Sequence, residues 1–92
     1  MKTKQRENTR KARYDNRALT IRSEEHIKYE NGVAVVRGEF DVDTLDELPM
    51  PAEISGKRLC QGSTALVISD GLLAVLTGDG KWRNCSGKII KG

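Results

Sequence analysis

A chain of 92 residues is long enough for one small domain, with or without a terminal arm. The hydrophobic fraction is 37% and only four residues are aromatic, so the core is small and part of the chain does not join it. No apolar run approaches the roughly 18 residues of a membrane span, and no secretory signal is visible. We therefore expect a cytoplasmic protein without a membrane partner. There Cys60 and Cys85 stay reduced, with a disulfide between strand ends as the alternative.

Positive charge is concentrated at the N-terminus. Residues 1–22 contain eight Lys and Arg against two acidic side chains, a charge of +6, whereas the whole chain carries +3. Residues 23–92 therefore carry −3. A basic arm on a mildly acidic body indicates a polyanionic partner for the arm.

Residues 2–18 contain good helix formers but almost no apolar face. We expect residues 1–19 to be a flexible basic arm, disordered or helical, that orders on a partner, and residues 20–92 to form a β-rich domain. At helical spacing four arginines form one stripe: Arg6, Arg10, Arg13 and Arg17. This stripe resembles the arginine-rich helices with which some phage antitermination and viral proteins grip RNA hairpins, and the resemblance implies contact with RNA. A solvated basic tail and a protein-docking helix are the alternatives. The candidate nucleic-acid-binding residues are Lys4, Arg6, Arg10, Lys11, Arg13 and Arg17.

Residues 19–21 are expected to begin a strand. Residues 26–37 predict a β-hairpin with a type I′ turn at Asn31-Gly32. The alternation of Ile27 and Tyr29 and the β-branched run after the turn favour it. The alternative is a helix that starts at Ser23 and stops at Asn31-Gly32. Two pairs are expected on the buried face of the hairpin: Tyr29–Ala34 and Ile27–Val36.

Five carboxylates fall within residues 39–47. Asp43 or Thr44 is expected to cap one helical turn that presents Leu45 and Leu48. The glycine and glutamate of an EF-hand loop are absent, so we expect no metal. This segment is either a solvated acidic loop or an acidic face that meets a basic partner or the chain's own arm. Its candidate protein-binding residues are Phe40, Asp43, Leu45, Asp46 and Glu47.

Residues 64–77 are two apolar runs around Asp70-Gly71, which predict a hairpin with a two-residue turn. In that register Leu66 faces Val75 and Ala65 faces Leu76. Both faces of the ribbon are apolar, so we expect it to be covered on both sides.

The remaining body predicts short strands separated by glycine-bearing turns. We expect strands at 52–54, 81–85 and 88–91, and a turn at 55–58. The fold class is mainly β, with α+β as an alternative, arranged as a small antiparallel barrel or curled meander. The end of the chain, V-L-T-G-D-G-K-W-R-N-C-S-G-K-I-I, resembles the G…G-K-[IV] ending of KOW-type SH3-like barrels of transcription and ribosomal proteins. That resemblance implies an SH3-like shape.

No constellation for catalysis is visible. His26 is the single histidine, and neither cysteine has a nucleophile or zinc-ligand context. We expect no enzyme activity, no cofactor and no small-molecule substrate. Trp82 is expected in the core, because the chain has so few aromatics; the alternative is an exposed stacking surface.

Charge and composition together predict a small regulatory or phage-like accessory protein that contacts RNA or DNA through the arm. Body cations such as Lys57, Arg58 and Lys81 or Arg83 could extend that contact. The alternative is a protein-binding inhibitor or adaptor of a larger nucleic-acid-processing enzyme, acting through residues 39–47 and a sheet edge.

Overall fold

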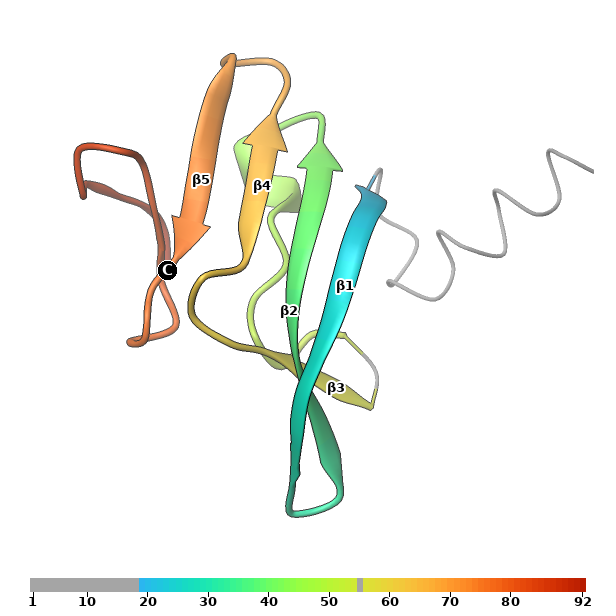
Figure 1. The fold of residues 1–92 in the computed structure, drawn as a ribbon. Helices are drawn as coiled ribbons and strands as arrows, with labels where there is room; N and C mark the ends of the chain where they lie inside the picture. Colours follow the sequence, from blue (N-terminus) through green and yellow to red (C-terminus); the bar gives the residue numbers. More distant parts are fainter. Residues whose placement is uncertain (1–18, 55) are drawn as a thin grey trace, which may run out of the picture.

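The computed structural model describes residues 19–54 and 56–92, which form one mixed sheet of seven strands (Figure 1). The sheet order is β1-β2-β4-β5-β6-β7, and β3 pairs with the free part of β2. The strands are β1 (Leu19–Glu30), β2 (Val33–Val42), β3 (Lys57–Leu59), β4 (Thr64–Val67), β5 (Leu72–Leu76), β6 (Trp82–Arg83) and β7 (Ile89–Lys91). One short 3-10 helix, η1 (Leu45–Glu47), follows β2. None of the helices in these two ranges is long and apolar enough to span a membrane.

The prediction of a mainly β domain is confirmed, but the expected antiparallel barrel or meander is wrong. The sheet is open, and β2 runs parallel to both β3 and β4. The physical reason lies in residues 43–56, which contain η1 and two prolines and are long enough for a crossover. The crossover carries the chain from the last residue of β2 back to the end where β2 begins, so the next strand runs parallel to β2. The SH3-like shape stays a prediction.

The N-terminal hairpin is confirmed, and the helical alternative is wrong. Asn31 and Gly32 have φ values of 54° and 79°, as a type I′ turn requires, and Tyr29 lies opposite Ala34. A register shift at Ile27 places His26 opposite Val36. Tyr29 and Ile27 are 73% and 43% exposed, not buried, because the tip of the hairpin projects beyond the rest of the sheet (Figure 1).

Strand β2 changes partner half-way along its length. Val36 lies opposite Leu59 in β3, whereas Glu39 lies opposite Thr64 in β4. The link 60–63 between β3 and β4 therefore contains two more residues than the stretch 37–38 of β2 that it faces. Ser63, fully buried, fills the resulting gap. Its Oγ accepts the Gly38 N–H at 3.1 Å and donates to the Cys60 carbonyl at 2.9 Å. The Ser63 hydroxyl thus accepts the Gly38 N–H in place of a backbone carbonyl of the neighbouring strand.

The β4–β5 hairpin forms with a register two residues away from the expected one. Leu66 lies opposite Leu73, and the loop spans residues 68–71. The Ile68 and Ser69 N–H groups donate to the Val42 and Asp43 carbonyls, both at 2.9 Å, so these residues prolong the pairing with β2. Gly71, at φ 59°, closes the loop.

The core lies on one face of the sheet, where Leu48 and Ile54 of the crossover segment pack against it. Its members are Leu19, Val36, Phe40, Val42, Leu48, Ile54, Leu59, Ala65, Val67, Ala74, Leu76 and Trp82. Burial of Trp82 is confirmed: the side chain is fully buried, and Nε1 donates to the Pro49 carbonyl at 2.8 Å. The expectation that the β4–β5 ribbon is covered on both sides is wrong, because Leu66 and Leu73 are 37% and 43% exposed.

Three local expectations have mixed outcomes. The helical turn after Thr44 is present as η1, and Leu48 is buried. The expected strand at 52–54 is absent, and residues 57–58 belong to β3 rather than to a turn. Strand β1 begins at Leu19, one residue before the expected start of the domain.

Candidate functional sites

The arm residues predicted to bind nucleic acid lie outside the described residues. They are Lys4, Arg6, Arg10, Lys11, Arg13 and Arg17.

The arginines of the described body are all engaged in ion pairs. Arg58 pairs with Glu30, Arg83 pairs with Asp79 at 3.0 Å, and Lys57 Nζ donates to both Glu24 oxygens at 2.7 and 2.8 Å. The remaining arginine pairs are Arg37–Glu25 and Arg22–Asp41. The exposed pairs among these contribute little to stability, because solvent screens them. They do, however, reduce the positive charge that Lys57, Arg58 and Arg83 were expected to offer to a nucleic-acid backbone.

Part of the acidic segment 39–47 is used inside the domain. The Glu47 carboxylate accepts the Asp43 and Thr44 N–H groups at 2.9 and 3.0 Å. Phe40 is 1% exposed and belongs to the core, so its side chain is not accessible to a partner. Leu45 is half-buried against that core, and Asp46 and Asp43 are exposed. Of the five candidate residues, the two aspartates are thus the most accessible.

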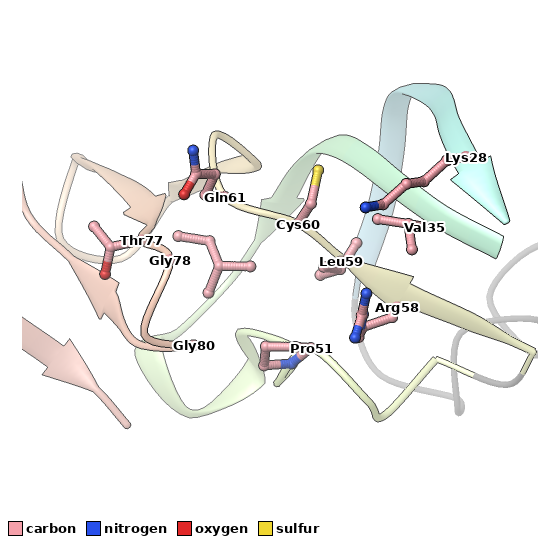
Figure 2. A pocket seen from close by; sticks show the side chains of 11 residues that line it. Lys28, Val35, Pro51, Arg58, Leu59, Cys60, Gln61, Thr77, Gly78 and Gly80 are labelled. Carbon is pink, nitrogen blue, oxygen red and sulfur yellow. The ribbon is translucent and has the colours of Figure 1, made fainter. Parts of the chain in front are cut away.

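A pocket of about 360 Å³ opens between β3 and the turn that follows β5 (Figure 2). Eleven residues line it, from β1, β2, β3, β5, the link 60–63, the crossover segment and the turn 77–80. Lys28 and Arg58 lie at one end, while Gln61 and Thr77 lie at the other. Cys60 lies between them.

The two cations at the pocket are held in a row across three strands. Lys28 and Arg58 both lie opposite Val35, which is 3% exposed beneath them. Both cations share the Glu30 carboxylate, with Lys28 Nζ 3.2 Å from Oε2 and Arg58 on Oε1. Hydrogen bonds from Arg58 and Lys28 lower the pKa of Glu30 below its ordinary value. Two positive charges therefore face one negative charge at this rim.

The opposite wall is built by the tight turn 77–80. The Thr77 hydroxyl hydrogen-bonds to the Asp79 carboxylate, and Arg83 donates to the same group at 3.0 Å. The Thr77 hydrogen bond, followed by that of Arg83, lowers the pKa of Asp79 from its ordinary 3.8 to about 2. Gly78 lies so close to Gln61 that a Cβ there would be 2.7 Å from Oε1. The hydrogen bonds from Thr77 and Arg83 to Asp79 therefore hold this turn together, and a substitution of Asp79 would weaken them.

We expect the substitution Asp79→Asn to lower stability at neutral pH, and the loss to disappear in acid. Because the pKa is lower in the folded state, the ionised carboxylate stabilises the fold above about pH 4, and this contribution is lost as pH falls toward 2. Urea midpoints of the two proteins, followed by circular dichroism, should therefore converge between pH 4 and 2. Asp70→Asn, the same charge change in the exposed β4–β5 loop, is the control. A midpoint difference that does not change with pH would contradict the prediction.

The face of the sheet opposite the core carries several exposed apolar side chains. Leu66 and Ile68 come from β4 and its loop, Leu73 from β5 and Ile89 from β7, and they are 37%, 55%, 43% and 45% exposed. Scattered exposed apolar residues are common on monomeric proteins. This face therefore identifies no partner.

Sequence reasoning did not find the pocket, because its lining residues share no motif and come from several separate stretches of the chain. Within the two described ranges, no group of three or more His, Cys, Asp or Glu side chains is arranged to hold a metal ion. Cys60 and Cys85 are free thiols.

Comparison with known proteins assigns no relative. No protein-family model matches the chain, and neither a curated protein nor a solved structure shows significant similarity to it.

Proposed function

We propose that this protein is a small non-enzymatic regulatory or accessory protein that contacts RNA or DNA through its basic arm. The observation that carries the proposal is the separation of charge along the chain. Residues 1–22 carry +6 and residues 23–92 carry −3. Every arginine of the described body already pairs with a carboxylate. The densest cluster of positive charge is therefore in the arm, and dense positive charge is what binding to a nucleic-acid backbone depends on.

The test is the fluorescence anisotropy of a labelled RNA hairpin and of duplex DNA with the full chain, at about 50 and 200 mM salt. Replacing Arg10, Arg13 and Arg17 by glutamine should weaken binding strongly. It should also flatten the salt dependence of log K by up to about 0.7–0.9 for each phosphate that is no longer neutralised. The control triple variant is Arg37→Gln, Lys81→Gln and Lys88→Gln, which removes the same charge from residues 23–92 and should have a small effect.

Absence of binding at the lower salt concentration, or equal losses in the two triple variants, would overturn the proposal. The alternative is a protein-binding inhibitor or adaptor, for which the exposure of Asp43 and Asp46 is the supporting observation. Under that alternative, the double variant Asp43→Asn with Asp46→Asn would lose binding to the protein partner, whereas the arm substitutions would leave that binding intact.

A further inference from the structure

We propose that the pocket between β3 and the turn 77–80 binds a small organic oxyanion, a carboxylate or phosphate group carried on a short apolar body. The proposal is independent of the arm and of nucleic-acid binding. It departs from the sequence-based expectation of no small-molecule partner, because the pocket exists only in the folded chain.

The first argument is charge. Among the eleven residues that line the pocket, Lys28 and Arg58 are cationic and none is acidic. This is unusual on a body in which residues 23–92 carry −3. Glu30, which both cations share, lies outside the lining, so the rim keeps an excess positive charge toward the pocket. Such a rim attracts an anion and disfavours a cation.

The second argument is placement. Lys28 and Arg58 approach from strands on either side of Val35, whose burial beneath them restricts where their stems can lie. Their side chains are still 57% and 47% exposed, so a ligand can reach the terminal nitrogens. Figure 2 shows the terminal nitrogens of Lys28 and Arg58 close to Leu59. A guanidinium and an ammonium at one rim provide charge-assisted hydrogen bonds to an oxyanion.

The third argument is the floor. Leu59 and Leu76 belong to the apolar core, and Pro51 closes the pocket from the crossover segment. A volume of about 360 Å³ is near the lower end of the usual range for ligand sites. An anionic group at the Lys28 and Arg58 end, attached to a ring or short chain over Leu59, fits this combination of charge and apolar surface.

The experiment is an NMR titration of the full ¹⁵N-labelled chain with four probes: benzoate, phenyl phosphate, inorganic phosphate and neutral benzyl alcohol. Saturable shifts of the Gln61, Thr77 and Gly78 amides are expected with benzoate, phenyl phosphate or both. Saturation by only one assigns the anion to a carboxylate or a phosphate. Benzyl alcohol should bind much more weakly, because it lacks the charge. Inorganic phosphate should also bind more weakly, because it lacks the apolar body.

Variants separate binding from structure. Lys28→Gln and Arg58→Gln should each weaken binding about threefold to tenfold. Glu30→Gln should strengthen it about twofold to fivefold, because the competing carboxylate is removed. A purely structural role of Glu30 predicts the opposite sign. Lys88→Gln, the same charge change away from the pocket, should leave the affinity unchanged.

Three results would overturn the proposal. One is the absence of saturable shifts up to about 10 mM of either aromatic anion. Another is an affinity that neither Lys28→Gln nor Arg58→Gln changes. The last is weaker binding in Glu30→Gln while circular dichroism shows the variant folded.

Discussion

Replacing Trp82 by alanine is expected to lower the free energy of unfolding by about 3–5 kcal/mol. Trp82 is the largest fully buried side chain of the described residues, with 0% exposure. It lies opposite Leu76 of β5 in the same core cluster, and its Nε1–H ties β6 to the Pro49 carbonyl of the crossover segment. Alanine would leave a large cavity and a buried carbonyl without its donor. Since small domains are stable by about 5–15 kcal/mol, this loss is a large fraction of the total stability.

Far-UV circular dichroism in urea is the suitable measurement, because Trp82 is the single tryptophan and its fluorescence disappears in the variant. Trp82→Phe is the matched control. It keeps an aromatic ring in the core but loses the hydrogen bond to Pro49, so its stability should lie between those of the wild type and Trp82→Ala. A loss below about 1 kcal/mol in Trp82→Ala would show that the side chain is not part of the core.

Replacing Gly38 by alanine is expected to cost about 1–3 kcal/mol. The backbone does not require glycine, since Gly38 is not among the residues with positive φ. The cause is the ring of Phe40, which lies over the Gly38 Cα. An added Cβ would be 2.3 Å from Cζ and 2.8 Å from Cε2. Phe40 is 1% exposed in a packed core, so the ring cannot move aside without displacing its neighbours.

A double-mutant cycle tests this cause. Phe40→Leu removes the ring, so Gly38→Ala should cost much less in that background, with a coupling of about 0.5–3 kcal/mol. Urea denaturation of the wild type, both single variants and the double variant measures it. Additive losses would mean that alanine at position 38 acts through something other than the ring.

Local signals predicted those parts of the molecule whose cause is local. The Asn31-Gly32 turn follows from the positive φ of two adjacent residues that tolerate it. The turn after Thr44 follows from a cap that a neighbouring carboxylate completes. Burial of Trp82 follows from composition, because a core with few aromatic residues must include its largest one.

The register of β4–β5, in contrast, depends on a distant segment of the chain. Asp70-Gly71 permits a two-residue turn, but Ile68 and Ser69 instead donate their N–H groups to the end of β2. Those acceptors lie far away in the sequence, so no local pattern could identify them. The parallel pairing of β2 with β3 and β4 has the same origin, since the crossover decides which edge the returning chain meets.

By itself, the sequence determined a mainly β domain, the Asn31-Gly32 turn and the separation of charge between the basic residues 1–22 and the acidic residues 23–92. These depend on residue type, spacing along the chain and summed charge. Only the tertiary structure decided the open mixed sheet, the single-sided core, the pairing of body cations with carboxylates and the pocket at Lys28 and Arg58. Each of these depends on contacts between distant segments, and their free energy is realised only when the chain brings those segments together.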